Sequence, residues 1–327
     1  MHRELELWQF VADRLKHGQP AMLLIVAESS GSSPGRQGYK MAIGTDGELT
    51  GSIGGGVMEV SLVEQSRRIL SETPAVADGL TSFIKAQQHR KKSPNPSGMI
   101  CSGRQTVIFR LFSQTDIDHV CSVIDALKDR RRAFLNISNR AISLSTYKRG
   151  VQKSDFRFEK LSDIEFVYTE KLGFKHDLFI IGGGHCSLAL SELMSKMDFY
   201  IRLFDDRPDL NTIDKNRFAH EISILENYET IAESIPSGSR SYVVVMTLGY
   251  RSDEIVIRSL LQRDLKYFGV LGSKAKMKTL LQALRNEGVP PEKLAAIHTP
   301  IGLAINSRTP EEIAVSIAAE IISVKNA

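Results

Sequence analysis

The chain has 327 residues, of which 42% are hydrophobic and 24% are charged, and its formal net charge at pH 7 is +4. This length allows about two domains, each with its own core. The net charge is too small to indicate a nucleic-acid-binding protein. No apolar run approaches the roughly 20 residues that cross a bilayer, and the first residues lack the apolar segment of a signal peptide. We therefore expect a cytoplasmic globular protein with no nucleic-acid or membrane partner.

The N-terminal segment predicts a helix, a buried strand and a loop. Apolar residues recur at helical spacing over residues 3–16, and residues 21–27 form a continuous apolar run of strand length. The run leads into a loop of small residues, 28–38, which contains Arg36. Its composition is compatible with a mobile linker, whereas a cation among glycines favours an anion-binding loop.

A predicted hairpin then leads to a first glycine turn. Residues 39–43 and 49–53 flank an Asp-Gly pair at 46–47, which is a strong turn signal. The second strand runs into three glycines, residues 54–56, and a helix follows them. Glu59, in the first turn of that helix, either interacts with the helix dipole as a structural residue or offers a polar group to a ligand on the glycines.

A basic segment with two prolines, residues 85–103, breaks the pattern, and we interpret it as a solvated surface loop. It ends in the sequence Gly-Met-Ile-Cys-Ser-Gly at residues 98–103. The thiol of Cys101 is either a reactive or metal-facing thiolate or a small buried hydrophobe. The chain's other cysteines, Cys121 and Cys186, form no CxxC pair, so we expect neither a disulfide framework nor a structural zinc site.

The remainder of the first half contains further short elements. The patterns predict a strand at 106–112, an amphipathic helix at 116–130, a strand at 133–137 and short strands over 141–169. We interpret this region as the end of a first domain plus a connector. The domains expected are residues 1–172 and 173–327.

Residues 178–187 predict the start of a dinucleotide-binding fold. Four apolar residues run into Gly182-Gly183-Gly184, and a helix follows. Gly182 allows the tight turn, and Gly184 lets backbone N–H groups approach a phosphate at the helix N-terminus. Ser187 replaces the third glycine of the fingerprint and is still small enough for close helix packing.

The residues after this turn complete the predicted unit. A second strand, residues 200–204, ends at Asp205, near the position of an acidic residue that accepts from a ribose 2′-OH. His185 is either a structural histidine or a catalytic acid or base. The order of strand, turn, helix, strand and acid therefore predicts a Rossmann-like fold.

The C-terminal sequence extends the sheet. Apolar runs at 242–247, 267–271 and 295–297 alternate with helical segments, as in a parallel doubly wound sheet. Ser273 is expected to cap a helix. Residues 309–312, Thr-Pro-Glu-Glu, form a capping box that begins a terminal helix ending at about residue 324.

Three blocks in this order resemble the XdhC/CoxI family, the accessory proteins that handle molybdenum cofactor for xanthine dehydrogenase and related hydroxylases. The first is residues 51–59 with the upstream Ser-Pro-Gly-Arg at 33–36, and the second is 98–103. The third is the Rossmann-like half with residues 271–274, 300–303 and 309–320. The resemblance covers about residues 5–324. It implies an α/β fold with an N-terminal XdhC/CoxI-type domain and a C-terminal Rossmann-like doubly wound parallel sheet.

Individual positions follow the family pattern, with two departures. The family's Gly-Met-x-Cys-Gly-Gly block falls on residues 98–103, where Ser102 replaces one glycine. Its Rossmann Gly-x-Gly-His falls on residues 182–185, and its Asp-Asp-Arg falls on 205–207. At residues 246–250, where relatives commonly carry Thr-His and a further histidine, this chain has Met-Thr-Leu-Gly-Tyr.

The resemblance implies an accessory protein rather than an enzyme. It would bind sulfurated molybdopterin as transient cargo, protect it and deliver it to a xanthine dehydrogenase-type molybdoenzyme, with a cysteine desulfurase or sulfurating protein as a further partner. Cys101 would supply a soft metal ligand or a persulfide acceptor, and we expect a homodimer. The cofactor-binding residues expected are Arg36, Gly54, Gly55, Gly56, Glu59, Cys101, Gly182, Gly184, His185 and Asp205.

Two other interpretations remain for the Rossmann-like half. An NAD(P)-dependent oxidoreductase would use the segment from Gly182 to Asp205 for its dinucleotide, with His185 as acid or base. A dimerisation scaffold would retain the fold with an emptied site, which is compatible with Ser187 and Leu248.

Overall fold

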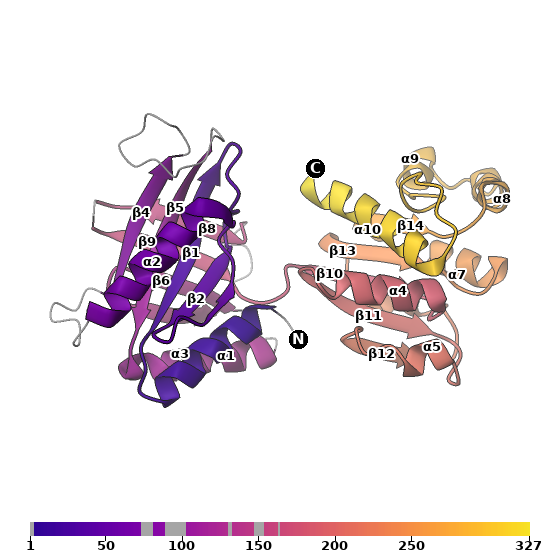
Figure 1. Ribbon diagram of the computed structural model, residues 1–327. Coiled ribbons are helices and arrows are strands. Elements are labelled where there is room, and N and C mark those ends of the chain that lie inside the picture. The colour runs from indigo at the N-terminus through magenta and orange to yellow at the C-terminus, as the bar shows by residue number, and fades with distance from the viewer. Residues whose placement is uncertain (1–2, 73–80, 89–102, 130–132, 147–153, 163) are drawn as a thin grey trace. The chain divides into compact units, whose positions relative to one another are not determined.

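The computed structural model describes residues 3–72, 81–88, 103–129, 133–146, 154–162 and 164–327. The chain divides into two compact units between Gly173 and Phe174. The described part of the first unit holds two antiparallel sheets, and the second unit holds one parallel sheet (Figure 1).

The first sheet of the N-terminal unit has the strand order β3-β2-β1-β5-β4. Its strands are β1 (Ala21–Ser30), β2 (Lys40–Gly44), β3 (Leu49–Gly51), β4 (Ser82–Gln88) and β5 (Arg104–Phe112). The predicted hairpin is therefore present as β2 and β3. Because β1 and β5 lie in the middle of the sheet, their side chains are buried on both faces, which explains the continuous apolar run at 21–27.

Each face of β1 has its own cover. Leu23 and Ile25 point into a core that includes residues of α1 (Arg3–Lys16) and α3 (Ile117–Lys128). Met22 and Leu24 point the other way, into a core with residues of α2 (Gly56–Glu72). The alternation is that of a strand between two layers.

A second antiparallel sheet completes the unit, with the order β7-β6-β9-β8. Its strands are β6 (Ala133–Ser138), β7 (Ile142–Thr146), β8 (Phe156–Lys160) and β9 (Phe166–Lys171), and a short 3-10 turn, η1 (Gln114–Asp116), precedes α3. A buried ion cluster joins the two sheets: Lys40 Nζ on β2 donates to Glu170 on β9 at 2.6 Å and to Glu4 on α1 at 3.1 Å. Tyr168 donates to the other oxygen of Glu170 at 2.9 Å.

The C-terminal unit is the predicted Rossmann-like sheet, with parallel strands in the order β12-β11-β10-β13-β14. The strands are β10 (His176–Ile181), β11 (Phe199–Asp205), β12 (Glu221–Ile224), β13 (Gly238–Val245) and β14 (Leu265–Val270). The strand order reverses between β10 and β13. In sheets of this kind, the carboxyl ends of the two strands beside such a switch point form the usual place for a ligand.

Helices cover both faces of this sheet (Figure 1). One face packs against α4 (His185–Met194) and α10 (Pro310–Asn326). The other packs against α7 (Tyr250–Leu260) and α8 (Lys274–Asn286). Shorter helices are α5 (Asn211–Asp214), α6 (Ile231–Ser234) and α9 (Pro291–Ala295). The caps predicted for α8 and α10 are present, since Ser273 accepts from the Lys276 N–H and Thr309 with Glu312 forms a capping box.

Three element predictions need correction. The apolar run 295–297 is not a strand of the sheet: α9 ends at Ala295, and a single bridge joins His298 to Gly269. Strand β12 was not predicted, because its residues alternate between half-buried and exposed at the sheet edge. The predicted surface loop 85–103 is in part a strand, since β4 extends to Gln88.

Among the described residues, no helix is both long enough and apolar enough to span a membrane.

Candidate functional site

Three glycine-containing segments of the N-terminal unit meet backbone to backbone. A Cβ atom on Gly35 would collide with the carbonyl oxygen of Ile53, and one on Gly54 would collide with the Gly35 nitrogen. A Cβ on Gly103 would lie 2.5 Å from the Ser33 nitrogen. We call residues 32–35, 53–55 and 103 the glycine junction. Glycine is required at positions 35, 54 and 103 because the main chains approach too closely there for any side chain.

Buried polar side chains hold the junction together. Ser33 Oγ donates to Gln105 Oε1 at 2.8 Å, and Gln105 Nε2 donates to Met58 Sδ at 2.8 Å. All three side chains belong to buried residues. They link the loop after β1, the strand β5 and the helix α2. Neither Gln105 nor Met58 was predicted from the sequence, because their polar partners become apparent only when these segments are assembled.

Glu59 occupies the glycine turn that precedes α2. Its Oε2 accepts from Ser52 Oγ at 2.7 Å and from the backbone N–H groups of Ile53 and Gly55, each at 2.9 Å. Burial opposes the charged form, but these hydrogen bonds outweigh burial and hold the pKa of the Glu59 carboxyl below its usual value. The carboxylate thus accepts backbone N–H groups of its own turn.

The other N-terminal candidates lie around this turn. Gly55 has φ +76° and open space where a Cβ would be, and Gly56 begins α2. Arg36 is exposed, and its guanidinium makes a long contact, 3.5 Å, with the Gly31 carbonyl oxygen. Cys101 lies outside the described residues. Gly103, two residues after it, is part of the glycine junction.

The second glycine turn, residues 182–184, joins β10 to α4. Gly182 has φ +105°, and a Cβ there would lie 2.9 Å from the Thr247 Cα and still closer to the Met246 carbonyl. Ser187 Oγ donates to the Gly182 carbonyl oxygen from the first turn of α4. Thr212 Oγ1 donates to the Gly183 carbonyl oxygen. The buried Ser187 therefore fits where the fingerprint has its third glycine.

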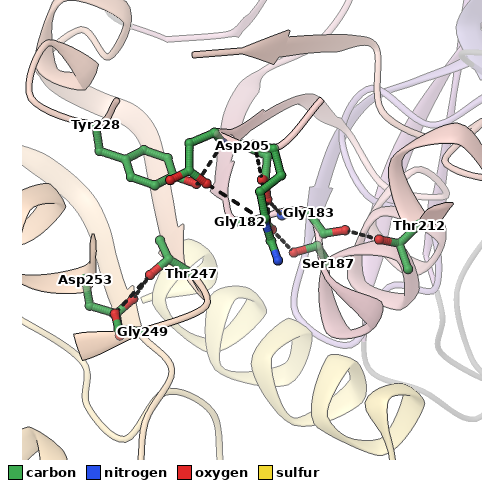
Figure 2. A network of polar contacts seen from close by, with 11 residues as sticks. Gly182, Gly183, Ser187, Asp205, Thr212, Tyr228, Thr247, Gly249 and Asp253 are labelled. Carbon is green, nitrogen blue, oxygen red and sulfur yellow. Dashed lines mark hydrogen bonds and ion pairs between the residues drawn. The ribbon is translucent and has the colours of Figure 1, made fainter. Parts of the chain in front are cut away.

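Asp205 is fully buried and bonds to this turn (Figure 2). Its Oδ2 accepts from the Gly183 N–H at 2.5 Å and from an Arg207 guanidinium nitrogen at 2.8 Å. Its Oδ1 accepts from the Arg207 backbone N–H and Nε, each at 2.8 Å. Burial raises the pKa of Asp205, but the hydrogen bonds from Arg207 and Gly183 lower it by more than this. The pKa of Asp205 therefore lies below its usual value. Both carboxylate oxygens already have partners within the chain.

The start of α4 is open. Gly184 is the N-cap of α4, and no side chain caps the helix at this residue. No atom lies within 4 Å of the position that a Cβ atom on Gly184 would take. His185, the first helical residue, is exposed. Cys186 is half-buried against the core beside α4 and α10, and burial raises the pKa of its thiol, with a further contribution from Glu311.

A further polar cluster, at the carboxyl end of β13, was not predicted from the sequence. Thr247 Oγ1 donates to Asp253 Oδ1 at 2.5 Å, and Lys276 Nζ donates to Asp253 Oδ2 at 2.7 Å. Asp253 is 1% exposed. Figure 2 shows Thr247 and Asp253 pointing toward each other beside the turn that carries Gly182. Residues 246–250 were singled out for departing from the family pattern, and that was the available signal.

The structure thus groups the candidates into two sets, one in each unit. Arg36, Glu59 and the first glycine turn belong to the N-terminal unit. His185, Asp205 and the second turn belong to the C-terminal unit. Within the described residues, no three His, Cys, Asp or Glu side chains are placed to hold a metal ion.

Comparisons with known proteins identify the same regions. A family model described as XdhC and CoxI family matches residues 14–78, and one described as XdhC Rossmann domain matches residues 178–321. A Bacillus subtilis (strain 168) protein described as a probable xanthine dehydrogenase subunit is 24% identical over 329 residues, which cover 95% of each chain. An uncharacterized protein of Escherichia coli (strain K12), YqeB, is 24% identical over 311 residues.

The chain spans 44% of the length of YqeB. A crystal structure from Bacillus halodurans, described as a xanthine dehydrogenase, has a TM-score of 0.71 at 23% identity and covers 100% of this chain and 96% of its own. That likeness shows a shared fold. The two family models together match more than half of the chain and include both glycine turns. The chain belongs to the XdhC/CoxI family.

Proposed function

We propose that this protein binds molybdenum cofactor, protects its sulfurated form and delivers it to a xanthine dehydrogenase-type molybdoenzyme. The observation that carries the proposal is the glycine junction: residues 33–35 and 53–55 of the first block of the family resemblance meet Gly103, the last residue of the second block, at one place. Family membership supports the same function. Molybdopterin is the cargo in this proposal, and the protein catalyses no turnover of its own.

The chemistry of the junction suits such a cargo. Molybdopterin carries a phosphate, a polar pterin edge and a metal held by dithiolene sulfurs. Exposed Arg36 offers a cation for the phosphate, and Gly55 borders open space in which another part of the cargo can lie. Cys101 offers a thiolate, as a soft ligand to the metal or as a sulfur carrier.

Glu59 has a positioning role in this proposal. Its carboxylate holds the N–H groups of Ile53 and Gly55 and so fixes the shape of the turn. A phosphate that approached the same N–H groups would meet this negative charge. The cargo's anionic group therefore binds on the Arg36 side of the junction, while Glu59 keeps the turn open.

The relatives support one of the proposed partners, the molybdoenzyme. The Bacillus subtilis relative is named as a probable subunit of xanthine dehydrogenase. We infer a molybdenum hydroxylase of the xanthine dehydrogenase type as the recipient. A cysteine desulfurase or another sulfurating protein would supply the sulfur, and the chain would act as a homodimer in the cytoplasm.

An NAD(P)-dependent oxidoreductase is the second candidate. The parallel sheet with a glycine turn at its switch point favours it. The internal partners of Asp205 argue against it, because the carboxylate expected to accept from a ribose diol is already fully hydrogen-bonded.

Native mass spectrometry after anaerobic purification tests the proposal. We expect a bound mass equal to molybdopterin cofactor in the parent chain and less of it in Cys101→Ala. Cys121→Ala is the matched control, since Cys121 lies on α3, outside the glycine junction. A bound dinucleotide would favour the oxidoreductase. A ligand-free parent from cells that make the cofactor would overturn the proposal.

A further inference from the structure

A pocket of the C-terminal unit lies between the turn that joins α7 to β14 and the short helix α9. Leu265 is the first residue of β14, so this turn is at the amino end of the strand. The second glycine turn and Thr247, in contrast, follow the carboxyl ends of their strands. Among the described residues that line the pocket, none belongs to either of them. The pocket is therefore separate from the switch point of the sheet.

The lining of this pocket is partly apolar, and its volume is about 300 Å³. Leu260, at the end of α7, and Phe268, on β14, are buried side chains of the lining, and Leu265 is half-buried beside them. Pockets that bind small molecules in proteins have volumes of roughly 300 to 1,000 Å³. This pocket is at the lower end of that range, so it suits a small ligand with an apolar body.

Two cations of the lining have only neutral partners. An Arg263 guanidinium nitrogen donates to the Ala232 carbonyl oxygen at 2.8 Å, and Lys293 Nζ donates to Gln262 Oε1. Both cationic residues are half-buried, and neither forms an ion pair with a carboxylate among the described residues. A guanidinium has five donors and an ammonium has three, so each cation retains donors for a ligand. A carboxylate of a ligand would give both of them an anionic partner.

Two carboxylates also line the pocket, next in sequence to these cations. Asp264 follows Arg263, and Glu292 precedes Lys293. Both acidic residues are exposed, and within the described ranges neither carboxylate accepts a hydrogen bond. They would repel a phosphate with two negative charges and attract an ammonium. The lining therefore favours a ligand that carries one charge of each sign.

We propose that this pocket binds an α-amino acid with an apolar side chain. The two cations pair with its carboxylate, the two acidic residues attract its ammonium, and Leu260 and Phe268 pack against its side chain. The inference goes beyond the proposed cofactor-carrier function, because it concerns a different ligand and a pocket at the other end of the parallel strands.

Isothermal calorimetry of the full chain with three related probes tests the inference. The probes are L-phenylalanine, phenylpropanoate, which lacks the ammonium, and phenylethylamine, which lacks the carboxylate. We expect L-phenylalanine to bind the parent at least about tenfold more tightly than either analogue, because only L-phenylalanine pairs with charges of both signs. It should also raise the melting temperature of the chain, since it binds the folded state.

Variants of the charged residues distinguish the two ends of the ligand. Lys293→Gln weakens L-phenylalanine and phenylpropanoate by about fivefold and leaves phenylethylamine within about twofold. Asp264→Asn combined with Glu292→Gln weakens L-phenylalanine and phenylethylamine instead, and phenylpropanoate binds at least as tightly as before. Lys278→Gln is the matched control, because Lys278 is an exposed lysine of α8 outside the pocket, and it leaves all three affinities within about twofold.

Three results would overturn the inference. The first is no binding of L-phenylalanine to the parent at millimolar concentration. The second is equal affinity for the three probes, which would show an unselective apolar cleft. The third is an unchanged affinity for L-phenylalanine in both pocket variants, which would place the ligand elsewhere. In each case an unaltered molybdopterin content of these variants, measured by native mass spectrometry, would leave the cofactor-carrier proposal standing.

Discussion

The two glycine turns of this protein look alike in sequence but are built differently. Each precedes a helix, and in each a carboxylate of the same chain accepts backbone N–H groups of the turn. In the N-terminal turn that carboxylate is Glu59, four residues beyond Gly55 and only partly buried. In the C-terminal turn it is Asp205, which comes from the neighbouring strand, is fully buried and is neutralised by Arg207.

This difference separates a local cap from a tertiary anchor. Glu59 and its turn belong to one continuous segment, so the interaction depends little on the rest of the unit. Asp205 joins β10 to β11, and its ion pair with Arg207 offsets part of the cost of burying its charge. We therefore expect the C-terminal turn to depend strongly on its carboxylate and the N-terminal turn to tolerate changes at Glu59 and Gly55 better.

The largest expected effect comes from a methyl group at Gly182. Gly182→Ala places a Cβ against the main chain of Met246 and Thr247 at positive φ, and we expect a loss of about 4 kcal/mol of stability. Gly55→Ala, also at positive φ but with open space, costs about 1 to 2 kcal/mol. Gly184→Ala, in open space and at negative φ, stays within about 0.5 kcal/mol.

Urea denaturation distinguishes the two units in these variants. Trp8 is the single tryptophan and is buried in the N-terminal unit, so its fluorescence reports on that unit. Far-ultraviolet circular dichroism follows both units. Equal losses for Gly182→Ala and Gly184→Ala would contradict the clash on which this prediction depends.

Removal of the buried carboxylate should have the next largest effect. Asp205→Ala leaves the Gly183 N–H and the Arg207 guanidinium without their shared partner, and costs about 2 to 4 kcal/mol. The exposed Asp209→Ala is the control and changes stability by less than about 0.5 kcal/mol.

The pH dependence of Asp205 has a definite sign. Since its folded pKa lies below the ordinary value of 3.8, it stabilises the fold above that value. The contribution is lost as pH falls below the ordinary value toward the lower folded pKa. Acid unfolding of the parent and of Asp205→Ala should therefore converge at low pH, and a constant difference down to the lowest pH would refute this assignment.

The sequence predicted the order of strand, glycine turn and helix around residues 182–184, but not the hydrogen bonds that hold this turn. The apolar run of β10, the glycines and the start of α4 follow from residues adjacent in sequence. The bond from Gly183 to Asp205 depends on the pairing of β10 with β11, so the same aspartate was assigned to a ribose. The network of Thr247, Asp253 and Lys276 likewise needs three elements in place before it can be recognised.

The N-terminal site was predictable only in part, again because its contacts join segments that are far apart in the sequence. Gly54 was selected from the sequence as a binding residue, and Gly35 and Gly103 lie in blocks of the family resemblance. The structure shows that they touch one another's segments. Their contact depends on the pairing of β1 with β5, which no local pattern encodes. The error at 295–297 has a local cause: three apolar residues are too few to define a strand, and the prolines at 290–291 favour a helix start.

Glu59 should show a smaller effect than Asp205. Glu59→Gln keeps a hydrogen-bonding side chain and removes the charge, so we expect a loss of about 1 kcal/mol. Because the folded pKa of Glu59 is below its usual 4.5, the stabilisation is present above that pH and fades below it. Thermal unfolding of the parent and of Glu59→Gln at pH 7 and pH 3 measures this stabilisation. A loss of stability in Glu59→Gln that is equal at the two pH values would contradict the expected pH dependence.

The smallest expected effect concerns dinucleotide preference. A carboxylate that accepts from both ribose hydroxyls normally favours NAD and repels the 2′-phosphate of NADP. In this chain Arg207 and the Gly183 N–H occupy both oxygens of Asp205, and Arg207 balances the charge. We therefore expect calorimetric affinities for NAD and NADP that differ by less than about threefold, which is within about 0.7 kcal/mol. A preference for NAD of tenfold or more that Asp209→Ala retains and Asp205→Asn removes would show that Asp205 leaves its internal partners to bind the ribose. The buried aspartate would then be a ligand-binding residue rather than an anchor of the turn.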